Sequence, residues 1–451
     1  MKRTLYFVIN TLVYMNGSIC KRVAILLLTV FVFVVNTFSQ TTDKKKDTAS
    51  WGIKFSGFLR NDILVDSRQT ANSCEGDIVL YPSDIAKDVN GVDKNAAASL
   101  NILPIASRLT GTITGPDAFG AKTSGIMEGE FFGFGNGTTQ NNVFGLRHAF
   151  IKLDWPRTQL AFGQYWHPLY NPECVPGELS FNGGMPFVPF NRSPQVRLTQ
   201  KLNNKFSFIF AAVSERDYES IIPANTSGLA TFTTAGVNAT DGTRNAVVPD
   251  LDAQLIYKSK TILVGAALDY KTLRPALAVG TAPGYVSTET VNSLSFEVYG
   301  KVTTKNVAVR AEYVAGQNMT DQVMLGGYVA YGTVPNITYK PTSVSSYWLD
   351  IAGTGKRIVP GIFMGYTKNN GASDENGIAS YGRGIAVNGR GIHDVTRVAP
   401  RIEINSGRFK FGLELEVTKA FYGNSDTDAK IIGGKDGVTD VHGLVLTAFY
   451  F

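Results

Sequence analysis

Two patterns in this chain constrain its fold more strongly than any other feature. Within many segments, apolar and polar residues alternate, and the connections between these segments are alternately long and short. Alternation with a period of two is typical of β-strands that have one apolar and one polar face. From the fourth segment onward, tight turns rich in Asn, Gly, Pro and Ser alternate with long connections rich in Gly, Asn and Asp. The short connections include 155–157, 203–204, 258–260, 304–306, 353–356 and 406–408, and the long ones include 69–106, 171–193, 216–248 and 370–393. A soluble β-sandwich has no reason to place every long loop on one side, whereas a transmembrane barrel has short periplasmic turns and longer outer loops.

Along the whole chain, the expected strands place apolar residues on one face and polar residues on the other. In the segment 410–421, Leu413 and Leu415 share one face, while Glu414 and Glu416 share the other. Because no apolar segment is left over to fill a core, we expect the polar faces to line water. The sequence therefore predicts an all-β fold, a transmembrane antiparallel β-barrel of about sixteen strands that is wide enough for an aqueous channel. The expected strands are 51–66, 158–167, 194–202, 205–214, 250–258, 261–271, 288–302 and 307–315, with others centred on Leu109, Phe131, Phe150, Leu349, Phe363, Pro400, Leu415 and Val445.

The two ends of the chain fit export and membrane insertion. The last expected strand runs without a tail to Phe451, and an aromatic end can anchor a closing strand at the membrane interface. Lys21 and Arg22 precede an apolar run that is short for a retained membrane helix and that ends near Ser39. We therefore expect a signal peptide over residues 1–39, a short periplasmic segment over 40–50 and the barrel over 51–451, with Met15 as an alternative start.

Charge and cysteine content exclude several partners. The formal charge is +6, and loss of the signal peptide, which holds four basic residues and no acid, leaves +2. No basic tract with interleaved aromatic residues remains, which disfavours nucleic acid as a partner. Cys74 and Cys174 stay in the mature chain and fall in expected loops, so a disulfide between them is possible in an oxidising compartment. The four histidines are scattered without ligand spacing, and we expect neither a metal site nor a cofactor.

The connection over residues 168–192 differs from the other long loops. It carries five prolines and six large apolar side chains of Leu, Phe and Met. Exposed loops are usually polar, so this segment is expected to pack against something. It follows the fifth expected strand and is therefore the third outer loop. We expect it to fold into the lumen and narrow it; a rigid lid or a subunit contact at the rim is the alternative.

Several motifs resemble the DcaP-like trimeric outer-membrane channels of Bacteroidetes. They are Gly57-Phe58-Leu59-Arg60-Asn61-Asp62, Phe144-Gly145-Leu146-Arg147-His148-Ala149-Phe150, Phe162-Gly163-Gln164-Tyr165-Trp166-His167-Pro168 and Asn191-Arg192-Ser193-Pro194-Gln195-Val196-Arg197-Leu198. The resemblance is strongest over residues 55–202. It implies a homotrimer of barrels in the outer membrane that passes small, often anionic solutes by diffusion. The periplasmic coiled coil of the best-known family members has no counterpart in the short segment 40–50.

A channel selects solutes by the electric field across its narrowest part, and arginines can grip carboxylates there. The inward candidates are Arg60, Arg108, Arg147, Arg197, Arg310, Arg397 and Arg401, with Arg192 on the folded loop. The opposing carboxylates are Asp62, Glu128, Glu130, Glu312 and Glu403, with Glu173 and Glu178 on the loop. For each arginine, an ion pair on the wall is the alternative, and the strand phase at Arg147 is ambiguous. Together with the family resemblance, these arginines predict a mild preference for anions.

Two other classes of barrel compete with a porin. An outer-membrane enzyme would need a nucleophile motif or a carboxylate pair at the rim, and no nucleophile motif is present. An adhesin or structural barrel without an open pore would fill its lumen with side chains, which a barrel of this many strands disfavours. We therefore expect a non-enzymatic, passive channel.

Overall fold

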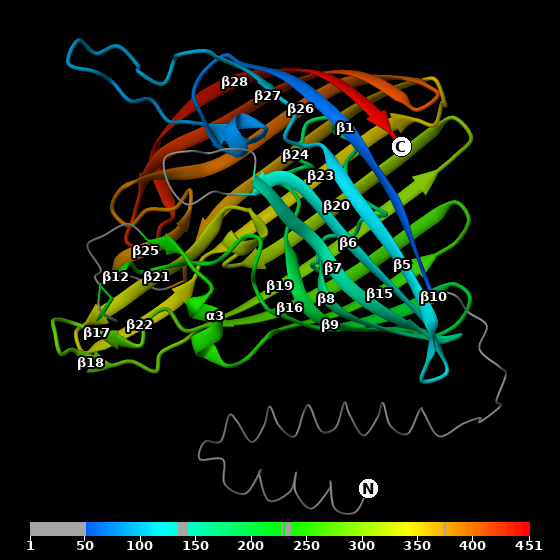
Figure 1. Ribbon diagram of the computed structural model, residues 1–451. Helices are drawn as coiled ribbons and strands as arrows, with labels where there is room; N and C mark the ends of the chain where they lie inside the picture. Colours follow the sequence, from blue (N-terminus) through cyan, green and yellow to red (C-terminus); the bar gives the residue numbers. More distant parts are fainter. Residues whose placement is uncertain (1–50, 134–142, 227–228, 231–235, 374–375) are drawn as a thin grey trace, which may run out of the picture.

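The computed structural model describes residues 51–133, 143–226, 229–230, 236–373 and 376–451. They form one closed antiparallel β-barrel with sixteen strands around its wall (Figure 1). The predicted signal peptide over 1–39 and the segment 40–50 lie outside the described residues. Among the residues described, no helix is long and apolar enough to cross a membrane.

The strands of the wall pair with their neighbours in chain order, and β28 closes on β1. They are β1 (Gly52–Asp66), β5 (Arg108–Ala118), β6 (Ala121–Gly133), β7 (Val143–Asp154), β8 (Thr158–Trp166), β9 (Arg192–Lys201), β10 (Phe206–Val213), β15 (Asp250–Lys258), β16 (Ile262–Leu273), β19 (Val291–Thr303), β20 (Val307–Gln317), β23 (Ser343–Gly353), β24 (Ile358–Gly371), β26 (Arg390–Ser406), β27 (Phe409–Ser425) and β28 (Ile431–Tyr450). Each of them matches one expected strand, so the predicted strand number and order are confirmed.

Proline does not interrupt β26. Pro400 pairs with Ile362 of β24, and the register with β27 is the same before and after it, at Val398 and Arg401. A proline removes one ladder hydrogen bond, and here the long flanking stretches of paired strand hold the register across that loss.

The second strand of the wall is broken into two pieces, which the sequence did not predict. β4 (Ser99–Leu103) pairs with the C-terminal part of β1, and β5 pairs with its N-terminal part. Ser107 bridges the break, because its hydroxyl accepts the backbone N–H of Arg60 at 3.0 Å. The last strand closes against the first in the register Phe58 to Tyr450, as expected for the seam.

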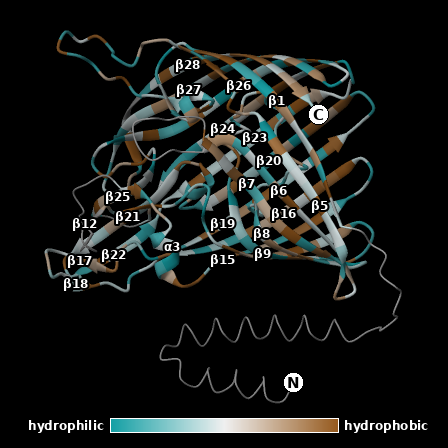
Figure 2. Cartoon of the chain, in the orientation of Figure 1, coloured by the Kyte–Doolittle hydropathy of each residue, from teal (hydrophilic) through white to brown (hydrophobic). Residues whose placement is uncertain are grey.

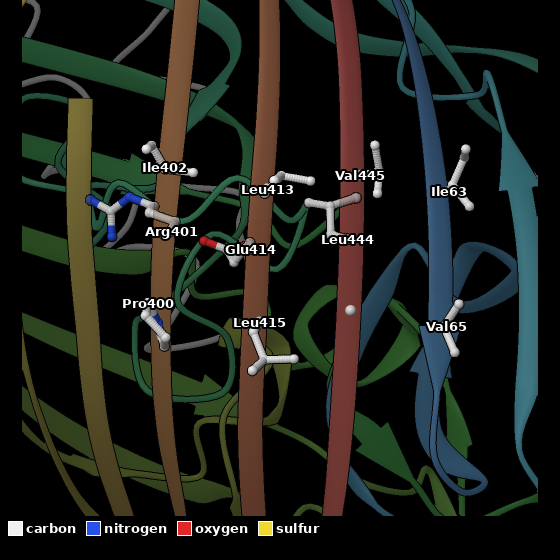
Figure 3. Close-up of a pocket in the computed structure, with 11 residues that line it drawn as sticks. Ile63, Val65, Pro400, Arg401, Ile402, Leu413, Glu414, Leu415, Leu444 and Val445 are labelled. Atoms are coloured by element: carbon white, nitrogen blue, oxygen red, sulfur yellow. The ribbon is translucent and has the colours of Figure 1, made fainter. Parts of the chain in front are cut away.

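The wall has an apolar outer face and a polar inner face. On β26 and β27, Ile402, Leu413 and Leu415 are 37%, 42% and 47% exposed, whereas Arg401 and Glu414 are buried. Figure 3 shows this part of the wall from β26 to β1, and Figure 2 shows apolar bands along the strands. At this place the inward side chains Arg401 and Glu414 are therefore covered by other parts of the chain.

The long loops gather at one end of the barrel, at the left in Figure 1, while the C-terminus lies at the other end. They carry their own short elements: β2 (Thr70–Ser73), η1 (Cys74–Gly76), β3 (Ile78–Pro82), β11 (Ile221–Ile222), β12 (Asn225–Thr226), β13 (Leu229–Ala230), β14 (Val237–Asn238), α3 (Asp241–Ala246), β17 (Ala278–Val279), β18 (Tyr285–Val286), η2 (Thr320–Gln322), β21 (Gly326–Thr333), β22 (Asn336–Pro341) and β25 (Gly377–Arg383). All residues of β3 are buried.

Candidate functional site: the third long loop and the inner wall

The segment 167–191 connects β8 to β9, and its two ends are joined at its base. The backbone N–H of His167 donates to the carbonyl oxygen of Asn191 at 2.9 Å. Its apolar side chains are buried rather than exposed, with Leu169, Met185 and Phe187 each 0% exposed. The packing that the sequence predicted for this loop is therefore present.

The middle of this loop hydrogen-bonds to the polar face of β27. The backbone N–H groups of Leu179 and Ser180 donate to the carboxylate of Glu414 at 2.8 and 2.7 Å. The amide of Asn182 donates to both oxygens of Glu416, at 3.1 and 2.8 Å. Two carboxylates of one strand thus hold one stretch of loop.

Further contacts tie the loop to other strands. The hydroxyl of Ser346 on β23 donates to the carbonyl oxygen of Phe187 at 2.8 Å. The thiol of Cys174 donates to the carbonyl oxygen of Gly300 on β19 at 3.2 Å, and Glu173 forms an ion pair with Lys258 of β15. The loop therefore leaves the wall between β8 and β9 and contacts β15, two strands from β9, as well as the more distant β19, β23 and β27.

Arg397 of β26 lies where the first and third long loops meet the wall. Its guanidinium group donates to the carbonyl oxygens of Met185 at 2.9 Å and Val79 at 2.8 Å, and its Nε lies 3.4 Å from Glu416. Asn182 completes the junction by accepting the backbone N–H of Val79 at 2.6 Å. The side chain of Arg397 is 0% exposed, so it holds the loops together and does not line an open passage.

Glu178 also lies inside this junction. One oxygen accepts the backbone N–H of Gly184 at 2.6 Å, and the other lies 3.8 Å from Arg397. Burial, reinforced by the charge of Glu416, raises the pKa of Glu178 well above its usual range. Glu178 therefore lies within the packed junction and, like Arg397, does not line an open passage.

Four of the predicted arginines cluster on another part of the wall, on β1, β5, β7 and β9. Glu130 pairs with Arg108 at 3.0 Å and Arg192 at 3.1 Å, and it also pairs with Arg147. The ring of Phe181, from the third loop, lies 5.4 Å from the guanidinium of Arg60, 5.7 Å from that of Arg108 and 5.9 Å from that of Arg147. Cation–π contacts of this kind favour an arginine beside an aromatic face.

The members of this cluster differ in exposure. The side chains of Arg108 and Arg60 are 20% and 11% exposed, whereas those of Arg192 and Arg147 are 7% and 4% exposed. Arg192 is the first residue of β9 and not part of the loop, which corrects our expectation.

A β-bulge explains why the strand phase at Arg147 was ambiguous. His148 pairs with Glu128 and Leu146 pairs with Gly129, so Arg147 has no partner residue on β6. The extra residue lets two consecutive side chains, Arg147 and His148, both be buried.

The remaining predicted arginines lie elsewhere on the wall. Arg310 and Arg401 both pair with Asp350, each at 2.7 Å, so two cations share one carboxylate. Arg197 donates to Gln195 at 2.8 Å and to the carbonyl oxygen of Trp166 at 2.6 Å. The structure does not bring these three to the cluster around Glu130.

Of three further carboxylates expected to oppose the arginines, one pairs with a predicted arginine and one pairs with a lysine. Asp62 pairs with Arg60 at 2.7 Å, and Glu403 pairs with Lys410 at 2.5 Å. Glu312 of β20 is buried.

The two cysteines of the described chain are free thiols. The possible Cys74–Cys174 disulfide is therefore not formed, and the Cys174 thiol instead donates to the backbone of β19. Burial raises the pKa of the thiols to about 11 for Cys74 and about 12 for Cys174, which makes both unreactive at neutral pH.

Two glycines on the inner face, which sequence reasoning missed, make room for the loop. A Cβ added to Gly365 of β24 would lie 2.6 Å from the ring of Phe187, and one added to Gly412 of β27 would lie 2.7 Å from Leu179. Glycine inside a strand marks such close approaches, and this was the signal available in the sequence.

Comparison with known proteins extends this description. No protein-family model matches the chain, and no curated protein matches its sequence. Solved structures do match. The chain has the fold of the outer-membrane porins. It is similar to the outer membrane channel DcaP of Acinetobacter baumannii, with 14% identity, a TM-score of 0.61, and 91% of this chain and 100% of that chain covered.

Two further structures share this fold. An anion-selective porin from Comamonas acidovorans matches with 11% identity and a TM-score of 0.51, over 89% of this chain and 100% of that chain. Outer-membrane expressed OmpT of Vibrio cholerae matches with 11% identity and a TM-score of 0.50, over 90% of this chain and 99% of that chain. At these identities the similarity establishes the fold.

Proposed function

We propose that this protein is an outer-membrane porin through which small hydrophilic solutes, mainly anions, diffuse passively. The observation that carries the proposal is the attachment of the segment 167–191 to the polar faces of strands far from its own, through Glu414, Glu416, Ser346 and Arg397. A loop held in this way crosses the interior of the barrel and narrows it. Because it is fixed by buried hydrogen bonds, it forms a constriction of constant shape rather than a mobile lid.

The arginines that remain partly exposed define the preference for anions in this proposal. Arg60 and Arg108 lie beside Phe181 at the edge of the loop, and Arg310 is 20% exposed on the inner wall. Arg310 and Arg401 share the single carboxylate of Asp350, and the excess of one positive charge leaves a positive field there. The buried Arg147, Arg397 and Arg401 instead hold the wall and the loops together.

The proposal also covers export, assembly and the absence of catalysis. We assign a cleaved signal peptide to residues 1–39, a homotrimeric assembly surrounded by outer-membrane lipid, and no enzymatic activity. The support for trimers is the resemblance of the motifs in residues 55–202 to trimeric channels, and the support for the location is the porin fold.

Conductance measurements on the purified protein in planar lipid bilayers test the function. We expect ohmic steps of conductance, with a reversal potential in a potassium chloride gradient that shows a mild preference for chloride. An absence of conductance would contradict the porin and favour an adhesin, a structural barrel or an enzyme. Clear selectivity for cations would contradict the assigned role of the arginines.

A further inference from the structure

Two aspartates face each other on the inner wall, close to the base of the third long loop. Asp252 of β15 pairs in register with Asp269 of β16, and the two side chains are on the same face. Asp252 is 1% exposed and Asp269 is 5% exposed. Two carboxylates directly opposite each other in a sheet repel, and burial strengthens the repulsion.

The nearest basic side chains are bound to other groups. Lys271 forms an ion pair with Asp321 and donates to the carbonyl oxygen of Asn318 at 2.6 Å. Arg197 donates to Gln195 and to the backbone of Trp166. Within the described part of the chain, both oxygens of Asp252 and Oδ1 of Asp269 are buried without a hydrogen-bond partner.

A histidine from the loop points at this pair. His167 is 1% exposed, its Nε2 has no hydrogen-bond partner among the described residues, and this atom lies 3.8 Å from Oδ2 of Asp252. One ligand atom from each of His167, Asp252 and Asp269 lies within 4.8 Å of the other two. Small side-chain rotations bring three such atoms to the bond lengths of about 2 Å that zinc makes with nitrogen and carboxylate oxygen.

We propose that His167, Asp252 and Asp269 bind one divalent metal ion of the zinc or manganese class. A donor set of one imidazole and two carboxylates suits these ions. The positive ion would offset the repulsion between the aspartates and supply the missing partners of their oxygens. The sequence did not predict this site because its ligands come from three separated segments, so no ligand spacing exists along the chain.

Coordination requires a change of tautomer at the histidine. Nδ1 of His167 accepts the backbone N–H of Leu169 at 3.3 Å, which places the ring proton on Nε2. When Nε2 binds the ion, this proton moves to Nδ1 and the hydrogen bond with Leu169 is released. The backbone N–H of the buried Leu169 then loses its acceptor, a cost that the bonds from the two aspartates and the histidine to the metal have to outweigh.

The ion would fasten the base of the loop to the wall. His167 is joined to Asn191 at the other end of the loop, and Gln254 of β15 donates to the carbonyl oxygen of Pro168 at 3.2 Å. The metal site therefore links the base of the loop to β15 and β16. It depends only on the geometry of the barrel and not on the proposed transport.

Metal binding by the full-length barrel, purified in detergent and treated with a chelator, tests the inference. Zinc chloride or manganese chloride is titrated in separate experiments, and bound metal is measured by elemental analysis after gel filtration. We expect one ion per chain and an increase in the temperature of unfolding. A chain that binds neither ion would overturn the inference.

Two variants separate loss of metal binding from loss of folding. Asp252→Asn and Asp269→Asn each remove the repulsion between the aspartates without changing side-chain size. We expect each to fold and to bind the ion at least roughly 100-fold more weakly, as loss of a direct ligand should exceed the loss of a supporting residue. Glu297→Gln is the matched control, since Glu297 is a buried acid on the neighbouring β19 whose oxygens also lack a described partner. Equal loss of binding in Glu297→Gln, or retained binding in Asp252→Asn and Asp269→Asn, would contradict the assignment.

Discussion

The guanidinium group of Arg397 donates a hydrogen bond of 2.9 Å to the backbone carbonyl oxygen of Met185, and this contact joins β26 to the third long loop. The same side chain binds Val79 of the first long loop and the hydroxyl of Thr418 on β27. One buried arginine therefore holds two loops and two strands together. Its removal should affect both the stability of the barrel and the position of the loop.

We predict that Arg397→Ala destabilises the barrel by about 3–5 kcal/mol, because it leaves the buried carboxylate of Glu416 without the cation 3.4 Å away. Free energies of unfolding from denaturant titration in lipid vesicles measure this. Single-channel recordings should show larger and noisier conductance, since the loop loses one of its anchors to the wall.

The matched control for that change is Arg390→Ala, on the same strand. Arg390 also reaches a loop, through Asp84, but its side chain is 34% exposed. Exposed ion pairs contribute about 0–1 kcal/mol, so this variant should unfold nearly as the parent does. Equal effects of the two substitutions would show that burial of Arg397 is not what makes it important.

The inner-face glycines give a second prediction, for Gly365→Val and Gly412→Val. The added side chains would enter the space of Phe187 and Leu179. Overpacking of this kind costs about 1–3 kcal/mol, and the loop should shift away from the wall. We expect lower stability and an altered conductance, measured as above. Gly433→Ala is the control, because a Cβ at that position meets nothing within 4 Å, and its conductance should match the parent.

The sixteen strands could be predicted from the sequence because their signal is local. Each one alternates between a lipid-facing and an inward-facing residue, as Leu413 and Glu414 do, and each turn has its own composition. The strand through Pro400 was predicted for the same reason, since the alternation continues on both sides of it.

The inner arrangement could be predicted only in part, because it depends on contacts between distant segments. The apolar composition of the third loop indicated that it packs against something, but not that Asn182 meets Glu416. Nothing local indicated that β3 of the first loop would be buried beside Arg397, or that Arg147 occupies a bulge. The cysteines remained unpaired because Cys174 turns toward β19.

A third prediction concerns pH and Asp77, in the first long loop. Burial first, and then the charge of Asp62, raises the pKa of Asp77 to about 7, and neither of its carboxyl oxygens has a hydrogen-bond partner among the described residues. In the unfolded chain this carboxyl ionises near its ordinary pKa of about 4. Between these values the folded state binds more protons than the unfolded state, so stability falls as pH rises from about 4 to about 7.

Asp77→Asn should remove this dependence. We expect the variant to be more stable than the parent at pH 8 and equally stable at pH 4, with unfolding temperatures in detergent as the measurement. Asp88→Asn, at an exposed turn of the same loop, should leave the pH profile of the parent unchanged. A parent whose stability rises between pH 4 and pH 7, with no difference from Asp77→Asn, would contradict the assigned role of this carboxyl.

The last prediction concerns charge selectivity and Arg108. This arginine is 20% exposed beside Phe181, where the loop approaches the inner wall. Arg108→Glu changes the local charge by two units and adds a third carboxylate next to Glu128 and Glu130. We expect the reversal potential in a potassium chloride gradient to move toward selectivity for cations. Arg244→Glu makes the same change of charge on the exposed helix α3, where its side chain is 68% exposed, and should leave selectivity unaltered. If both substitutions shift the reversal potential equally, selectivity arises from the overall charge of the barrel and not from the arginines beside the loop.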